Sequence, residues 1–274
     1  MGGGDLLKMV TDALWAAGKQ TVTGVCECTS LLGPGLGGGH GILQARHGLV
    51  ADQFVFINVG AGHNFGIVTS VTSKIYNVAH KDWAWQTFIY SGDRVEALYS
   101  LINYHFLKNG TQPIDLQNYS FFFNSPHLHP GRACPTSAFP LASKFTMLKR
   151  ERRDQYDLFS STTQKNPALN ESMYLFEGYS TQGVKAIDGA SSSFAFRDDV
   201  ILVSPLIIYE RAGDKLDHQA ADLGRQLRDL MQKASGQHEL HAYVNYAYRD
   251  ETLNMYGYET WGQRKLTLDG ALRP

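Results

Sequence analysis

The chain has 274 residues, a formal net charge of −1 and 43% hydrophobic residues, which describes an ordinary globular protein able to bury a core. The near-zero charge argues against a nucleic-acid partner, and no apolar run reaches the length of a membrane span, so neither partner is predicted. Three cysteines in a chain this long do not make a disulfide framework. The N-terminus lacks the pattern of a signal peptide, and the sequence assigns no cellular compartment.

The first 80 residues alternate predicted strands with glycine-rich loops. Residues 5–17 are predicted to form a helix capped by Asp5, because apolar side chains recur on one face. Strands are predicted at residues 20–25, 52–59 and 67–78. The loops between them are GPGLGGGHG at residues 33–41 and GAGHNFG at residues 60–66.

Helices and strands alternate after about residue 80. Helices are predicted at residues 93–108, 149–166 and 214–235. Strands are predicted at residues 118–126, 172–180, 198–210 and 238–248. In the first helix, the side chains predicted to point inward are Val95, Leu98, Leu101, Ile102 and Phe106. This order predicts an α+β fold in which an antiparallel sheet is covered by helices.

The first glycine loop formally matches a dinucleotide-binding fingerprint through Gly33, Gly35 and Gly38. We reject this interpretation, because a helix would have to begin inside three consecutive glycines. Each glycine destabilises a helix by about 1 kcal/mol relative to alanine. A bare loop can turn its amides toward an anion or let a flat ligand lie against the backbone. A solvent-exposed turn is the plainer alternative.

The string GVCECTSLLGPGLGGGHGILQARHGLVAD at residues 24–52 resembles the flavin loop of FAD-linked oxidases. These belong to the vanillyl-alcohol-oxidase superfamily with its PCMH-type FAD-binding domain, and the closer resemblance is to the berberine-bridge-enzyme-like branch. GAGHNFGIVTSVTSKIY and HAYVNYAYRDETLNMYG resemble the next flavin-contacting segment and the strand that returns to the flavin. The resemblance implies a partial FAD-binding domain over residues 1–79, a substrate-binding α+β domain over 80–240 and a returning segment over 241–274.

The resemblance also implies roles for individual residues. Cys26 matches the cysteine that bonds to the flavin ring, so FAD is predicted to be covalently attached there, and Cys28 stays open as the neighbouring alternative. Tyr246 is implied near flavin and substrate, where a phenol is a base only if its pKa falls from about 10. The residues implied to contact the flavin are Gly33, Gly35, Gly37, Gly38, Gly39, His40, Gly41, Gly60, Gly62, His63, Asn64, Gly66, Ile67, Val68 and Asn245.

Plainer roles remain open for some of these residues. His40 and His63 could equally be buried, hydrogen-bonded structural histidines, and Tyr246 could be an ordinary core aromatic. The sequence also departs from the family pattern. We expect the N-terminal subdomain, with its second covalent link through a histidine, to be missing. We also expect internal segments to be shortened before Gly60 and around residues 124–139, as in an incomplete copy or a reduced relative.

The leading hypothesis is an FAD-dependent oxidoreductase that acts on a small organic substrate in fungal-type secondary metabolism. The resemblance implies hydride transfer to flavin N5 and reoxidation by O₂. The alternative is a flavin-free cyclase, a binding protein or an inactive remnant on the same substrate domain. No metal site is predicted. The aromatic residues predicted near the substrate are Tyr174, Phe176, Tyr179 and Tyr209.

Overall fold

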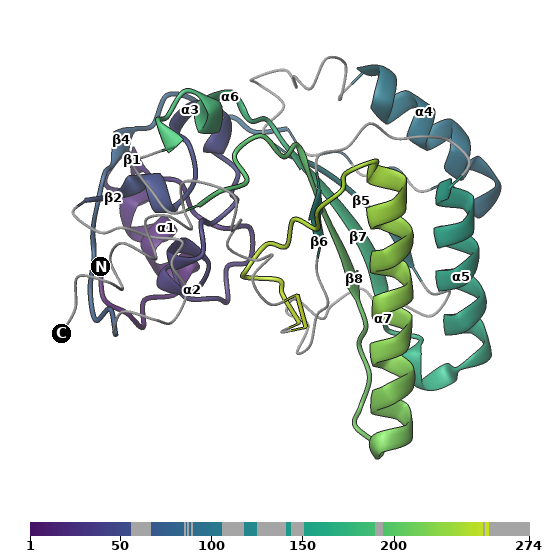
Figure 1. The fold of residues 1–274 in the computed structure, drawn as a ribbon. Coiled ribbons are helices and arrows are strands. Elements are labelled where there is room, and N and C mark those ends of the chain that lie inside the picture. Colours follow the sequence, from purple (N-terminus) through teal and green to yellow (C-terminus); the bar gives the residue numbers. More distant parts are fainter. Residues whose placement is uncertain are drawn as a thin grey trace.

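The computed structural model shows a smaller part built from the N-terminal elements beside a larger part in which a four-stranded sheet is covered by helices (Figure 1). The domain boundaries given above stay a prediction. The structure describes residues 1–55, 67–84, 86, 88, 90–105, 118–124, 141–143, 151–189, 194–248 and 250–251.

The smaller part begins with helix α1 (Leu7–Ala16), which confirms the first predicted helix. Asp5 is not its cap, because Leu6 occupies that position and no side chain bonds to the helix end. The Asp5 carboxylate instead accepts a hydrogen bond of 2.7 Å from the Gly2 amide and holds the turn before the helix.

The three strands predicted for this part are much shorter than expected. The structure has two antiparallel pairs, β1 with β4 and β2 with β3, each two residues long. Side chains add further links between these segments; for example, the Thr21 hydroxyl donates to the Lys74 carbonyl at 2.8 Å. Residues 56–66, which include the rest of the second predicted strand and the second glycine loop, lie outside the described residues. The short strands are β1 (Lys19–Gln20), β2 (Phe54–Val55), β3 (Thr72–Ser73) and β4 (Tyr76–Asn77).

A short helix that was not predicted, α2 (Leu32–Leu36), lies inside the glycine-rich string and ends at Gly37. Pro34 is tolerated there because it sits within the first turn, where its missing N–H has no intrahelical partner to lose. The helix closes before the three consecutive glycines. The chain then continues through α3 (Gln44–His47) and the 3₁₀ turn η1 (Ala51–Gln53).

The larger part is built on an antiparallel sheet of order β5-β7-β8-β6, which confirms the predicted sheet. Its strands are β5 (Asn118–Asn124), β6 (Leu141–Ser143), β7 (Met173–Tyr179) and β8 (Ile201–Leu206). Pro205 lies within β8, which is unusual because proline cannot donate to a ladder. Among the described residues, β6 pairs with Ile201–Val203 and does not reach Pro205.

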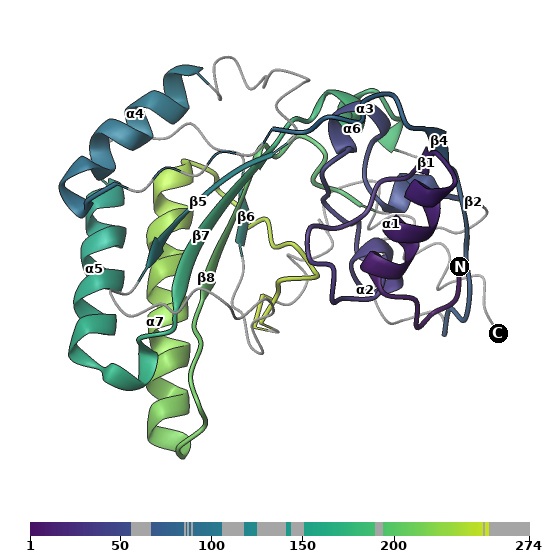
Figure 2. The ribbon, with the colours of Figure 1, turned by 180° about the vertical axis from the view of Figure 1, so that it is seen from behind.

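Helices cover one face of this sheet (Figures 1 and 2). The long helices confirm the predicted ones, and their apolar faces meet β7 and β8 in one core. Leu101 was wrongly predicted to point inward: it is 48% exposed, and Tyr99 fills the core position instead. The helical elements are η2 (Gly92–Arg94), α4 (Val95–His105), α5 (Glu151–Lys165), η4 (Pro167–Leu169), α6 (Gln182–Lys185) and α7 (Asp214–Ser235).

The two faces of β7 have different neighbours, because successive side chains of a strand point to opposite sides. Tyr174 and Phe176 belong to the core under the helices, so their predicted position near a substrate is not supported. Glu177 and Tyr179 lie on the opposite face. There Leu202 of β8 joins the core of the smaller part. Tyr209 packs at the edge of the helical core.

The prediction of a last strand at residues 238–248 is wrong. Residues 244–246 form a turn, closed by a 2.8 Å hydrogen bond from the Tyr246 amide to the Tyr243 carbonyl. The alternating aromatic residues that suggested a strand instead direct their side chains toward the glycine loop and β7. The segment therefore joins the two parts through side chains rather than through a ladder.

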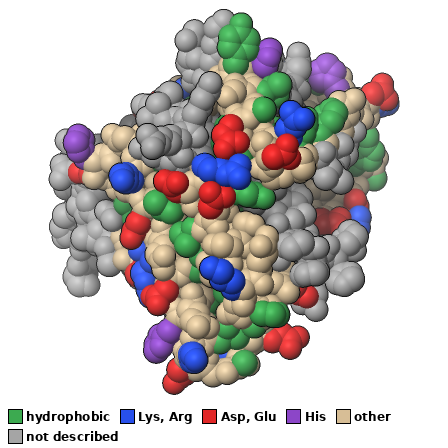
Figure 3. All heavy atoms as spheres, turned by 90° about the vertical axis from the view of Figure 1, so that its right-hand side faces the viewer, with side chains coloured by type: hydrophobic (Ala, Val, Ile, Leu, Met, Phe, Trp, Pro, Cys, Tyr) green, Lys and Arg blue, Asp and Glu red, His purple; other side chains and the backbone are tan. Residues whose placement is uncertain are grey.

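The helical face carries interspersed charges of both signs, with no single-sign field (Figure 3). Among the described residues, no helix is both long and apolar enough to span a membrane.

Candidate functional site

Two neighbouring amides of the glycine loop point at one oxygen atom. The amides of Gly39 and His40 donate to Tyr243 Oη at 3.1 and 3.2 Å. The loop turns there because Gly38 and Gly39 have φ angles of 112° and 77°, which only glycine adopts readily. Consecutive amides aimed at one point form a small anion-binding concavity. Two amides of the glycine-rich loop therefore turn toward one acceptor oxygen, which is one of the arrangements that such a loop allows.

The glycines of this loop are packed against protein rather than against solvent. A Cβ atom at Gly37 would collide with Asn245, at Gly38 with Phe194 and at Gly39 with Val50. Gly35, Gly37, Gly38, Gly39 and Gly41 are buried, whereas Gly33 is exposed. The alternative of a solvent-exposed turn is therefore wrong for most of the loop.

Asn245 fastens the C-terminal segment to the same loop. Its Nδ2 atom donates to the Pro34 carbonyl at 2.7 Å and to Tyr243 Oη at 2.6 Å. The structure therefore brings Asn245 and the first glycine loop together, although 200 residues separate them in the chain. Burial raises the pKa of Tyr243 to about 12, so its hydroxyl stays protonated.

His40 is held neutral among aromatic rings. It stacks on Tyr179 at 5.6 Å and meets the edges of Phe194 and Tyr243. Gln44 Oε1 accepts from the Gly41 amide and lies 3.1 Å from His40 Nδ1, so Nδ1 carries the proton. Burial lowers the pKa of His40 to about 4. His40 therefore lies on the glycine loop and is also a hydrogen-bonded histidine packed among aromatic rings, the structural role that the sequence left open.

A buried acid faces these rings, and sequence analysis missed it. Glu177 on β7 is 5% exposed, and its two carboxylate oxygens accept from Tyr179 Oη and Tyr246 Oη, each at 3.0 Å. Burial raises the pKa of Glu177, and the two phenol donors oppose that rise. The available signal was an acidic residue in the centre of an apolar strand, where acids are rarely buried without a purpose.

Tyr246, the predicted base, is a hydrogen-bond donor in this arrangement. Burial and the neighbouring Glu177 carboxylate raise the pKa of Tyr246 well above its ordinary value. A lowered pKa, the condition for a tyrosinate base, is therefore not met. The Cys26 thiol adds a smaller contribution to the raised pKa of Tyr246.

The two neighbouring cysteines differ in state. Their Sγ atoms lie 3.0 Å apart, so the two side chains point the same way. Cys28 is disulfide-bonded, whereas Cys26 is not part of a disulfide. The choice of Cys26 as the linkage residue stays a prediction.

The second glycine loop contributes little to the described site. Gly60, Gly62, His63, Asn64 and Gly66 lie outside the described residues. Ile67 is 93% exposed, and Val68 packs at the edge of the core of the smaller part. Their predicted contacts with a flavin stay predictions.

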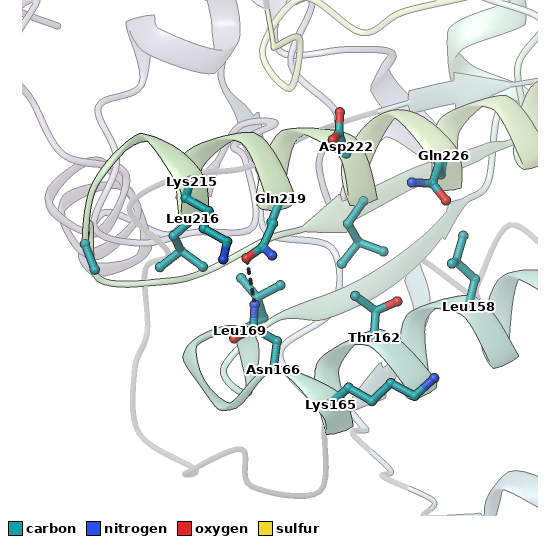
Figure 4. Close-up of a pocket in the computed structure, with 12 residues that line it drawn as sticks. Leu158, Thr162, Lys165, Asn166, Leu169, Lys215, Leu216, Gln219, Asp222 and Gln226 are labelled. Atoms are coloured by element: carbon teal, nitrogen blue, oxygen red, sulfur yellow. Dashed lines mark hydrogen bonds between the residues drawn. The ribbon is translucent and has the colours of Figure 1, made fainter.

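The space beside the His40 ring is small. A cavity of about 10 Å³, enough for one water molecule, lies between His40, Tyr179, Phe194 and the start of β8. A separate open groove of about 670 Å³ runs between α5 and α7, where Asn166 and Gln219 bridge the two helices (Figure 4). The groove contains no residue of the predicted site, and it lies on the far side of the sheet.

Comparison with known proteins identifies the family. No family model matches the chain. The FAD-linked oxidoreductase chyH of Penicillium rubens is 39% identical over 343 aligned positions, which cover 96% of this chain and 68% of that protein. The solved VAO-type flavoprotein MtVAO615 from Myceliophthora thermophila superposes with a TM-score of 0.67 at 14% identity, covering 98% of this chain and 64% of that one. The berberine-bridge-enzyme-like protein 1 of Physcomitrella patens gives 0.70 at 15% identity, covering 98% and 73%.

The chain therefore belongs to the FAD-linked oxidoreductases, enzymes whose cofactor is FAD, and its α+β fold is that of the VAO-type and berberine-bridge-enzyme-like flavoproteins. This confirms the family predicted from the glycine-loop motifs. The alignment to chyH is longer than the 274 residues of this chain. That relative therefore contains internal segments that this chain lacks, in agreement with the predicted shortening.

The residues of the site fit a flavin in their chemistry. The paired amides of Gly39 and His40 suit an acceptor oxygen of the kind that a flavin ring and its phosphates carry. The phenol of Tyr243 takes the acceptor position in the structure. A ring can therefore lie against the loop only after the Tyr243 hydroxyl has moved away.

Proposed function

We propose that this chain binds FAD against the first glycine loop and oxidises a small organic substrate at the Tyr246 end of the site. The observation that carries the proposal is a chain of contacts: the Gly39 and His40 amides donate to Tyr243, and the Tyr243 ring lies 5.2 Å from the ring of Tyr246, which donates to Glu177. When bound, FAD supplies a hydride acceptor at N5 and passes the electrons to O₂, which becomes hydrogen peroxide.

The chain's own residues have separate tasks in this proposal. The amides of Gly39 and His40 bind an acceptor oxygen of the cofactor, and Cys26 holds the ring through its sulfur. Neutral His40 presents an uncharged face to the ring because its pKa of about 4 keeps it deprotonated. Tyr179 and Phe194 restrict the inner side of the site to a cavity of about 10 Å³, enough for one water molecule. Fungal secondary metabolism is the proposed setting, in line with the resemblance found in the sequence; the relative chyH comes from a fungus, Penicillium rubens.

The proposal is tested by loading the purified protein with FAD, photoreducing it without oxygen and then admitting air. We expect stoichiometric flavin, its bleaching on reduction and the release of hydrogen peroxide as the yellow colour returns. A folded, colourless protein that does not take up FAD would reject the proposal. The closed packing around the 10 Å³ cavity would then favour the flavin-free alternative.

A further inference from the structure

Two sulfur atoms meet in the segment that leads to the first glycine loop. Cys26 Sγ and Cys28 Sγ lie 3.0 Å apart, about 1 Å farther than two sulfurs joined by a covalent bond. The two atoms are in different chemical states, because Cys28 is disulfide-bonded whereas Cys26 is not part of a disulfide. A thiol is therefore in contact with one sulfur of a disulfide, which is the starting arrangement for thiol–disulfide exchange.

A tight turn keeps the two cysteines together. The Thr29 amide donates to the Cys26 carbonyl at 3.3 Å, and the Thr29 hydroxyl donates to the same oxygen at 2.9 Å. The chain therefore turns back within residues 26–29, the stretch that carries both cysteines. Because both hydrogen bonds are made inside these four residues, neither of them depends on the disulfide of Cys28.

The pair is also accessible from solution. Cys28 is exposed and Cys26 is half-buried, so small thiols and small disulfides reach both sulfurs. Exposed disulfides exchange more readily than buried ones, because the attacking thiolate must approach one sulfur directly. Contact between the sulfurs and access from solvent are the two conditions for a reactive pair, and residues 26–28 meet both.

We propose that Cys26 and Cys28 form a thiol–disulfide exchange site. The Cys26 thiol loses its proton to water, and the thiolate attacks Cys28 Sγ. A bond forms between the two cysteines while the present disulfide bond of Cys28 breaks, and the sulfur that leaves takes the electron pair and then a proton. One disulfide replaces another, so this step needs no oxidant.

The same site takes a small disulfide when Cys28 is reduced. The Cys28 thiolate attacks oxidised glutathione, and one glutathione leaves as a thiol. The Cys26 thiolate then displaces the second glutathione and closes the bond to Cys28. Two cysteine thiols are oxidised to a disulfide, and one molecule of oxidised glutathione is reduced to two of the thiol form.

The exchange also bears on the cofactor, and this consequence rests on the proposed function. Cys26 is the residue predicted to bond to the flavin. A sulfur held in a disulfide has no thiolate to offer, so closure of the bond to Cys28 blocks attachment and reduction restores it. Cys28 thereby decides when Cys26 is available to the cofactor.

Oxidised glutathione is the probe, and peptide mapping after N-ethylmaleimide labelling is the measurement. One tryptic peptide, residues 20–46, contains both Cys26 and Cys28. The third cysteine, Cys134, lies outside the described residues and is replaced in Cys134→Ser, so that glutathione supplies the disulfide. We expect the folded variant to give this peptide with neither label nor glutathione and two hydrogens lighter than its reduced form. The rate of closure should rise about tenfold per pH unit below the thiol pKa of about 8.5.

The matched control combines Cys26→Ser with Cys134→Ser, which keeps Cys28 and removes the attacking thiol. In this control glutathione should stay on Cys28. Wild-type protein at pH 8 should give the closed peptide in a measurable fraction of molecules, and this result does not depend on the folding of a variant. A Cys134→Ser protein that keeps glutathione on Cys28 and label on Cys26, or a wild-type peptide that is never closed, overturns the inference.

A last comparison separates the exchange from the proposed function. Cys134→Ser is reduced with dithiothreitol or closed with oxidised glutathione, desalted and then loaded with FAD. We expect flavin in the acid pellet of the reduced protein and only in the supernatant of the closed protein. Equal covalent attachment in both overturns the control of attachment by Cys28. A protein that takes up no FAD in either state overturns the proposed function, whereas the exchange itself is decided by the peptide map alone.

Discussion

The ion pair between Asp52 and Arg197 should contribute more to the free energy of unfolding than a solvent-exposed ion pair does, because both of its partners are buried. The Asp52 side chain is 1% exposed and that of Arg197 is 9%, and the closest contact is 2.5 Å. A second guanidinium nitrogen reaches the other carboxylate oxygen at 3.1 Å. The pair connects η1, just after the glycine loop, with the segment before β8.

Asp52→Asn keeps the shape of the side chain and removes the negative charge that pairs with the Arg197 guanidinium. Removing one partner of a buried pair costs about 3–5 kcal/mol, so we expect a loss of that size in the free energy of unfolding. The melting temperature should fall by on the order of 10 °C for a chain of this length. The assay is urea unfolding followed by both circular dichroism and tryptophan fluorescence.

Two further variants separate burial from charge loss. Asp12→Asn removes one charge of the exposed pair with Lys8, whose side chains are 57% and 63% exposed, and should leave the free energy of unfolding nearly unchanged because solvent screens such a pair. Replacing both buried partners with Asp52→Leu and Arg197→Met should recover most of the single-variant loss. A loss below about 1 kcal/mol for Asp52→Asn would refute the reasoning, since that is the value of a solvent-screened pair.

Three other outcomes are expected. Gly41→Ala should destabilise the protein by about 1–3 kcal/mol in urea unfolding, because its Cβ would collide with the Thr23 carbonyl, whereas Gly4→Ala, which meets nothing within 4 Å, should be neutral. Tyr243→Phe should cost the FAD-free protein about 1–3 kcal/mol, since two buried amides lose their acceptor; an unchanged urea midpoint would contradict this. The His40 proton resonances should show no titration above pH 5. Because its folded pKa of about 4 lies below the unfolded value, stability should be complete above about pH 6.5 and fall as the pH drops toward 4.

The helices and the main sheet could be predicted because their patterns are local and long. Helix α7 occupies the predicted residues 214–235, since its apolar side chains repeat at helical spacing over six turns and Gly236 ends it in a left-handed conformation. In the smaller part, β-branched residues around Thr72 suggested a long strand. β-propensity gives a strand only where a neighbouring edge supplies hydrogen bonds, and β3 and β4 each find a partner for only two residues.

The candidate site was only partly predictable. The glycine loop, Cys26 and Asn245 followed from the resemblance to a family. Glu177 did not, because its strand was interpreted only as a hydrophobic segment. Its partner Tyr246 lies 69 residues away, in a segment wrongly predicted as a strand, and only the fold shows that the two side chains meet.

The central claim, that this chain holds FAD beside Cys26, is tested most directly by the visible absorption spectrum of the purified protein before and after acid precipitation. We expect flavin absorbance that stays with the acid pellet in wild type and in Cys28→Ala, and that moves to the supernatant in Cys26→Ala. Flavin found only in the wild-type supernatant would contradict the covalent link while leaving the cofactor in place. A folded protein with no flavin in either fraction would contradict the claim as a whole.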